Sequence, residues 1–96
     1  MFVREMGCEP RELINWLPMA GGDWYPEIGL WLDGQFIHGN QSGTIRLLAK
    51  TMPRRKIALM NLPVTHISFE FPEGWLEAEK GRFMGRFDLY TRRGGG

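Results

Sequence analysis

The sequence predicts an α+β domain: a two-layer sandwich with an N-terminal helix, a three- or four-stranded antiparallel sheet and a C-terminal helix. Apolar residues recur at helical spacing near both ends of the chain, whereas the middle alternates apolar and polar residues as half-buried strands do. The 96 residues suffice for one domain, so residues 1–96 are expected to form a single unit. Hydrophobic residues make up 43% and charged residues 24%, the composition of a folded chain.

The first helix is expected to begin at Pro10, because proline suits the first helical position, where its missing N–H costs nothing. Leu13 and Leu17 follow at a spacing that puts them on one side. Pro18 is expected to end the helix. Residues 1–7 are compatible with an irregular segment, a helical turn or a short edge strand, and the sequence does not decide between these.

Residues 24–38 are expected to be extended, since Ile28, Leu30 and Leu32 alternate with their neighbours. Asp33-Gly34 predicts a tight turn, because glycine accepts a positive φ. The polar segment 39–43 predicts a second, flexible turn.

A long hairpin is expected next, with strands near 45–50 and 57–62. The basic segment Pro53-Arg54-Arg55-Lys56 has the length of a hairpin connection and is predicted to join them. Pro63 predicts a kink or a sheet edge. A further strand, 64–71, shows the clearest alternation in the chain.

Residues 75–91 predict the C-terminal helix, with one apolar stripe made of Leu76, Phe83, Phe87 and Tyr90. Gly81 and Gly85 each weaken a helix by about 1 kcal/mol relative to alanine. They are compatible with a helix that lies close against the sheet.

Charge is distributed unevenly along the chain. The net charge is +1, yet residues 1–45 carry −4 and residues 46–96 carry +5. Five bases and no acid lie between 46 and 56, namely Arg46, Lys50, Arg54, Arg55 and Lys56. Either the two halves fold against each other so that their charges interleave, or these bases contact an anionic partner such as nucleic acid.

The sequence argues against most enzyme classes. Cys8, His38 and His66 are too far apart in the chain to form a ligand pair, so no metal site is predicted. No glycine pattern of a phosphate-binding loop and no nucleophile elbow occurs. Cys8 lies just before a helix start, where a thiolate would be favoured, but it is an isolated signal. A non-enzymatic function without a cofactor is therefore favoured.

The localisation expected from the sequence is cytoplasmic. The first residues lack the pattern of a signal peptide, and no apolar run is long enough to span a membrane. The single cysteine cannot form an internal disulfide.

Two segments show a limited resemblance to known families. The order helix–strands–helix is similar to that of the double-stranded RNA-binding domain, but 72–77 is acidic and apolar where that family carries lysines. The end of the chain, Arg92-Arg93-Gly94-Gly95-Gly96, resembles the termini of ubiquitin-like and sulfur-carrier proteins. Those termini follow a strand, whereas this one follows a predicted helix, so residues 93–96 are expected to be a flexible glycine tail.

The function predicted from these observations is a protein–protein interaction module that self-associates as a homodimer or docks on another protein. Trp31 is expected on the sheet face opposite Ile28 and Leu30, and Leu48 and Met60 are expected to extend that apolar face. Exposed aromatic and Met side chains are enriched at protein interfaces. The alternative is a small nucleic-acid-binding protein that acts through the basic hairpin 46–56.

Overall fold

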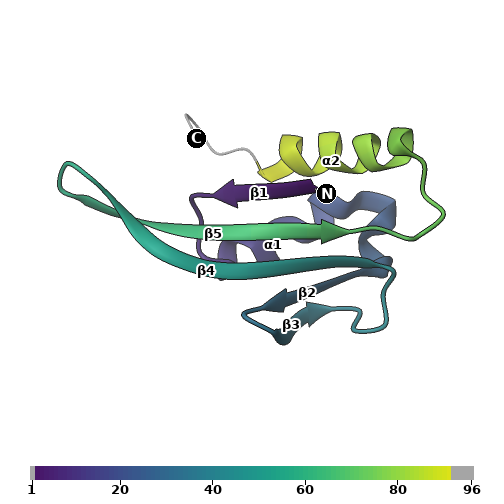
Figure 1. Cartoon of the computed structure of the whole chain (residues 1–96), viewed down its shortest axis with the longest axis horizontal. Helices are drawn as coiled ribbons and strands as arrows, with labels where there is room; N and C mark the ends of the chain where they lie inside the picture. The colour runs from purple at the N-terminus through teal and green to yellow at the C-terminus, as the bar shows by residue number, and fades with distance from the viewer. Residues whose placement is uncertain (1, 92–96) are drawn as a thin grey trace.

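The computed structural model describes residues 2–91, which build a five-stranded sheet with two helices packed on one face (Figure 1). The elements in chain order are β1 (Phe2–Met6), α1 (Pro10–Gly21), the 3-10 helix η1 (Gly22–Glu27), β2 (Ile28–Leu32), β3 (Gln35–Gly39), β4 (Ile45–Ile57), β5 (Met60–Glu70) and α2 (Glu77–Thr91). The predicted α+β class is confirmed. The open question about residues 1–7 is answered by β1, an edge strand paired with β5.

The sheet order is β1-β5-β4-β2-β3, and the sheet is mixed rather than wholly antiparallel. β2 and β4 run parallel, with Ile28 beside Ile45, while every other pair is antiparallel. The expected count of three or four antiparallel strands is therefore wrong. The physical reason is the position of β3, which pairs with β2 at the edge of the sheet. The segment 40–44 then leads the chain back past the first residue of β2, so that β4 starts beside Ile28 on the opposite side of β2 and runs in the same direction.

The core lies between the sheet and the helices. β4 contributes Leu47 and Ala49, and β5 contributes Ile67 and Phe69, as the period of two requires. Phe87 of α2 meets Phe69 edge-on, with ring centroids 4.9 Å apart. Their neighbours along β4 and β5 therefore point to the opposite side, which we call the helix-free face.

Helix α1 continues through Pro18 to Gly21, so the predicted end at Pro18 is wrong. Pro18 lacks the backbone N–H that would donate to the carbonyl four residues earlier, so the helix loses one hydrogen bond there. The proline ring lies on the exposed side of the helix, and the helix continues past it. The helix ends instead where the N–H of Gly22, at a φ of 55°, donates to the Pro18 carbonyl. The chain then passes into η1 in place of the extended structure expected from residue 24.

Helix α2 buries Phe83 and Phe87 as predicted, together with Met84. Leu76 precedes the helix and Tyr90 lies at the edge of the stripe, so both are exposed rather than buried. A Cβ built at Gly81 or Gly85 would have no atom within 4 Å. The two glycines therefore do not serve a close approach of α2 to the sheet, since they lie on the open side of the helix.

The β4–β5 hairpin extends well beyond the rest of the sheet and sets the 45 Å length of the molecule (Figure 1). β2 pairs with β4 only over 45–49, and β1 pairs with β5 only over 65–69. Residues 53–63, which we call the arm, form ladder pairs only with each other.

The turn of the arm lies at Ala58-Leu59, not at 53–56 as expected. Residues 53–56 belong to β4, where Arg55 pairs with Leu62 and Lys56 with Asn61. The ladder shifts register between Met52 and Arg55, and Pro63 faces this bulge from β5. Pro53 and Pro63 both lie at this bulge, where the ladder does not use the backbone N–H groups that proline lacks. The strand can therefore continue through Pro63.

Candidate functional site

Two of the three predicted interface residues, Trp31 and Leu48, lie side by side on the helix-free face, where they are direct partners in the β2–β4 ladder. Both are half-buried. The Trp31 ring lies against the sheet, because a Cβ at Gly29 would come within 2.7 Å of it. Phe36 contacts the ring edge-on at 5.4 Å, and the Arg46 guanidinium lies 4.7 Å above it.

The third predicted residue, Met60, lies elsewhere. It pairs with Ile57 at the end of the arm, next to the turn. The structure therefore separates the predicted interface into two places, the helix-free face and the arm tip.

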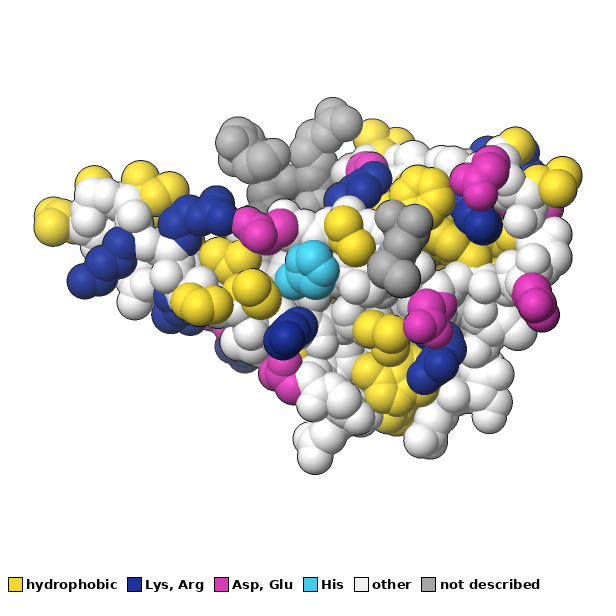
Figure 2. All heavy atoms as spheres, in the orientation of Figure 1, with side chains coloured by type: hydrophobic (Ala, Val, Ile, Leu, Met, Phe, Trp, Pro, Cys, Tyr) yellow, Lys and Arg dark blue, Asp and Glu magenta, His cyan; other side chains and the backbone are white. Residues whose placement is uncertain are grey.

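The arm tip is the most exposed apolar feature of the described chain. Ile57 is 53% exposed, Met60 is 59% exposed and Leu59 is fully exposed. Figure 2 shows these apolar side chains at the far end of the molecule, with basic side chains along the arm behind them. Ile57 and Leu59 were missed as site residues because the turn was expected at 53–56. The run of apolar residues over 57–62, without a predicted helix to cover it, was the available signal.

The five predicted anion-contacting bases all lie in β4. Three of them are already paired: Arg46 with Glu70 at 3.3 Å, Arg54 with Glu9 at 3.3 Å and Arg55 with Glu5 at 2.6 Å. Lys50 lies on the helix-free face opposite His66, and Lys56 lies near the arm tip opposite Asn61. Among residues 2–91, neither lysine forms an ion pair.

Arg54 and Arg55 hold the base of the arm from two sides. Glu9 precedes α1, on the side of the helices, and Glu5 lies in β1 opposite His66, on the helix-free face. Arg54 also donates to the Asn61 carbonyl at 3.1 Å. These contacts neutralise much of the positive charge of the arm, which supports the interpretation that the two halves of the chain interleave their charges.

A shallow hollow of about 470 Å³ lies on the helix-free face beside the base of the arm. Its lining includes Leu48, Lys50, His66 and Ser68, together with Asp33. Asp33 accepts from the Thr51 amide at 3.0 Å and from the Thr51 hydroxyl at 2.9 Å, so the β2–β3 turn is fixed to β4 here. An apolar centre with a polar rim is the usual composition of a protein-binding patch.

The candidate catalytic residues are not brought together. Cys8 is fully buried in the core, and its carbonyl accepts from the Thr65 hydroxyl at 2.9 Å. His38 Nε2 and the Tyr25 hydroxyl form a hydrogen bond of 2.8 Å. His66 lies on the helix-free face, across the sheet from Cys8. Within residues 2–91, no group of three His, Cys, Asp or Glu side chains is placed to hold a metal ion.

The edge strand β1 is joined to α2 by a bidentate ion pair. Arg4 donates to both carboxylate oxygens of Asp88, at 2.9 and 2.8 Å. These hydrogen bonds, with the charge of Asp88, raise the pKa of Arg4 against a smaller opposing effect of burial. Arginine is effectively always protonated in proteins, so the pair keeps its positive partner as the pH rises.

The predicted glycine tail, 93–96, lies outside the described residues. No helix among residues 2–91 has the length and apolar character needed to cross a bilayer. Comparisons with protein-family models, with curated proteins and with solved structures gave no match.

Proposed function

We propose that the chain is a non-enzymatic protein-interaction module that docks through the arm, with a second copy of the chain as its partner. The observation that carries this proposal is the arm tip, where Ile57, Leu59 and Met60 present apolar side chains to water. Burying an aliphatic side chain is worth about 1.5–3 kcal/mol, so a partner surface that covers these three gains substantially.

The arm itself supports docking, because a two-stranded hairpin alone is marginally stable in water. Ion pairs hold its base, but no described element covers its tip. A partner that packs on the tip supplies the cover that the described part of the chain does not.

The helix-free face provides a receiving surface for the tip of a second copy. Trp31 and Phe36 lie beside the hollow, and Leu48 lines it together with the polar groups of Lys50 and His66. In a dimer with a two-fold axis, the arm tip of each copy packs on the helix-free face of the other copy. The same contact is therefore made twice and the dimer is closed. The charge on the arm base is largely paired internally, which reduces repulsion between two such copies.

Sedimentation equilibrium tests this proposal. The wild-type chain should dimerise with a Kd on the order of micromolar, about −8 kcal/mol. Leu59→Ser removes the most exposed tip side chain, and Ser68→Arg fills the hollow on the receiving face. Each should weaken association at least about tenfold, which corresponds to about 1.4 kcal/mol.

Leu76→Ser is the matched control, since Leu76 is 69% exposed but lies beside α2, away from both surfaces. It should associate as the wild type does. A monomer at every concentration would contradict the dimer, and equal weakening by Leu76→Ser would show that general hydrophobicity rather than the arm drives association.

Nucleic-acid binding through 46–56 is the second candidate. It is supported by the alignment of five bases in one strand that reaches the end of the molecule, two of them without an ion pair in the described chain. Fluorescence anisotropy of labelled DNA and RNA oligomers tests it at about 50 and 200 mM salt, a range over which phosphate-driven binding weakens steeply. Binding that is lost in Lys50→Ala/Lys56→Ala would support this candidate, and absence of binding at low salt would exclude it.

A further inference from the structure

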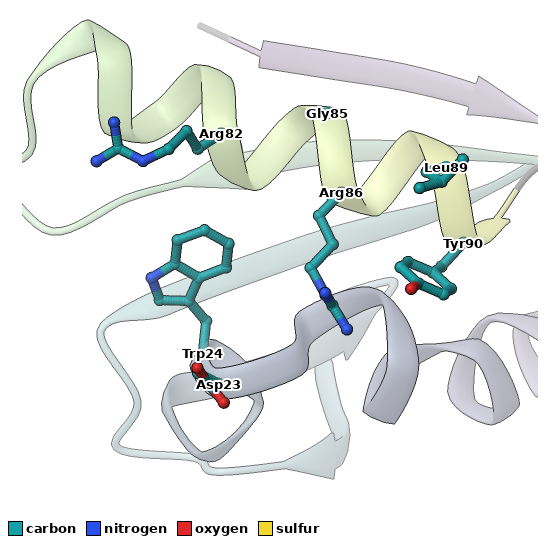
Figure 3. Close-up of a pocket in the computed structure, with 7 residues that line it drawn as sticks. All are labelled: Asp23, Trp24, Arg82, Gly85, Arg86, Leu89 and Tyr90. Atoms are coloured by element: carbon teal, nitrogen blue, oxygen red, sulfur yellow. The ribbon is translucent and has the colours of Figure 1, made fainter.

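A groove of about 680 Å³ lies between η1 and α2, on the side of the molecule that carries the helices (Figure 3). Trp24 lines it from η1, and Arg82, Gly85, Arg86 and Tyr90 line it from α2. Its volume is in the range of small-molecule sites, about 300–1,000 Å³. Neither the arm nor the helix-free face contributes to it, so it is independent of the proposed docking function.

The two arginines keep their charge available. Arg86 Nε donates to the Met19 carbonyl at 3.0 Å, and its guanidinium lies 4.6 Å from the Tyr90 ring. A Cβ at Gly22 would come within 2.5 Å of Arg86 Nε, so this side chain also packs against the end of α1. Within residues 2–91, neither Arg82 nor Arg86 forms an ion pair. A guanidinium oriented by a carbonyl and a ring still has donors for an incoming anion.

The acidic residue of the groove does not neutralise them. Asp23 lies on the η1 side, and Figure 3 shows its carboxylate at the lower end of the groove, below Trp24. With two positive groups and one negative group in the lining, the groove favours a negatively charged ligand.

The apolar part of the groove is built around Trp24, which packs against two further rings. Trp24 is held by Trp75 and Phe83, at centroid distances of 5.8 and 5.4 Å. Gly85 also lines the groove from α2, and its lack of a side chain leaves the helix backbone open there, whereas the Arg86 side chain stands between Trp24 and Tyr90 (Figure 3). A planar ring can therefore lie against the helix at Gly85, beside Trp24 and on the Trp24 side of Arg86.

We propose that this groove binds a small planar aromatic anion, with its carboxylate held by Arg86, its charge attracted also by Arg82, and its ring against Gly85 and Trp24. The anionic group meets the excess of positive charge in the lining, and the ring meets the apolar surface of Trp24. Bidentate binding of a planar carboxylate is the geometry that arginine suits best.

Titration with 1-naphthoate, followed by ¹⁵N NMR, tests the site. The Trp24 indole N–H and the Gly85 amide should shift in a saturable way, with a Kd on the order of 0.1–1 mM, as expected for a ligand of this size. Arg82→Gln should raise the Kd, and the uncharged analogue 1-naphthalenemethanol should bind at least about tenfold more weakly.

Gly85→Leu and Gly81→Leu form a matched pair. Both exchange an open glycine of α2 for a better helix former, and a Cβ at either position meets nothing. Only Gly85 lines the groove, so Gly85→Leu should raise the Kd at least about tenfold while Gly81→Leu leaves it unchanged.

Absence of saturable shifts at Trp24 and Gly85 up to about 5 mM naphthoate would overturn the proposal, since that excludes even weak binding. Equal affinity of Gly85→Leu and the wild type would also overturn it. Equal affinity of the alcohol and the carboxylate would overturn the anion site. If instead an acidic amphipathic helical peptide shifts these signals and naphthoate does not, the proposal is overturned in favour of a peptide-docking surface.

Discussion

At the scale of single residues, Gly22 is constrained both by its own backbone and by a neighbouring side chain. Its φ of 55° and ψ of −128° lie where residues with a side chain are strained, and it caps α1. The Arg86 guanidinium occupies the space that a side chain would need. Gly22 is therefore required both by the backbone and by the contact between α1 and α2.

Gly22→Ala should lower the free energy of unfolding by about 1–3 kcal/mol, the usual cost of a strained backbone residue. Urea denaturation followed by circular dichroism measures this effect. Gly74→Ala is the control, because Gly74 has no positive φ and a methyl group added there would meet no atom within 4 Å. If the two substitutions cost the same, the Gly22–Arg86 contact does not contribute to stability.

Asp33 and Gly34 show how much of a residue's role is local. The dipeptide predicted a tight turn, and the structure confirms it, with φ values of 50° and 87°. The two hydrogen bonds from Thr51 to the Asp33 carboxylate were not predictable, because they depend on β4 running parallel beside β2.

At the scale of elements, α2 has a buried side made of apolar side chains and an exposed side that includes two glycines. Phe83, Met84 and Phe87 hold it on the sheet, whereas Gly81 and Gly85 are open. The sequence pattern was enough to predict the helix, but it could not tell which side the glycines faced, because a glycine has no polarity to indicate it.

Gly81→Ala should stabilise the protein by about 0.5–1 kcal/mol, since alanine is the better helix former and its methyl group meets nothing. Thermal unfolding should show a raised Tm for this variant. A lowered Tm would mean that Gly81 packs against another group, contrary to the open side of α2 described above.

At the scale of the whole molecule, the fold consists of a packed body and a projecting arm. Every buried apolar residue of the core cluster lies outside the arm, residues 53–63. Glu5 and Glu9, from the acidic first part of the chain, pair with Arg55 and Arg54 from the basic second part. Part of the charge asymmetry of the sequence therefore forms ion pairs inside the molecule. The sequence alone did not decide between such internal pairing and contact with a partner.

Replacing residues 53–63 by Asn-Gly should leave the body folded, because Met52 and Val64 are already a ladder pair that a two-residue turn can join. The loss of two exposed ion pairs should cost no more than about 2 kcal/mol. Calorimetry should show one cooperative transition, and sedimentation should show a monomer. An unfolded product would mean that the arm belongs to the folding unit.

The sequence by itself determined the features that arise from neighbours along the chain. The α+β class, the start of α1 at Pro10, the Asp33-Gly34 turn and the burial of Phe83 and Phe87 follow from local periodicity and turn chemistry. These signals act within a few residues and need no knowledge of the rest of the fold.

Only the tertiary structure decided the strand order, the place of the β4–β5 turn and the two candidate binding surfaces. The parallel β2–β4 pair and the arm depend on which strands meet, and the basic segment 53–56 carried a turn-like signal that strand pairing overrode. The groove joins η1 to α2, and the receiving face joins β2, β4 and β5. Surfaces built from distant segments exist only after the chain has folded, because side-chain proximity there is set by packing and not by sequence spacing.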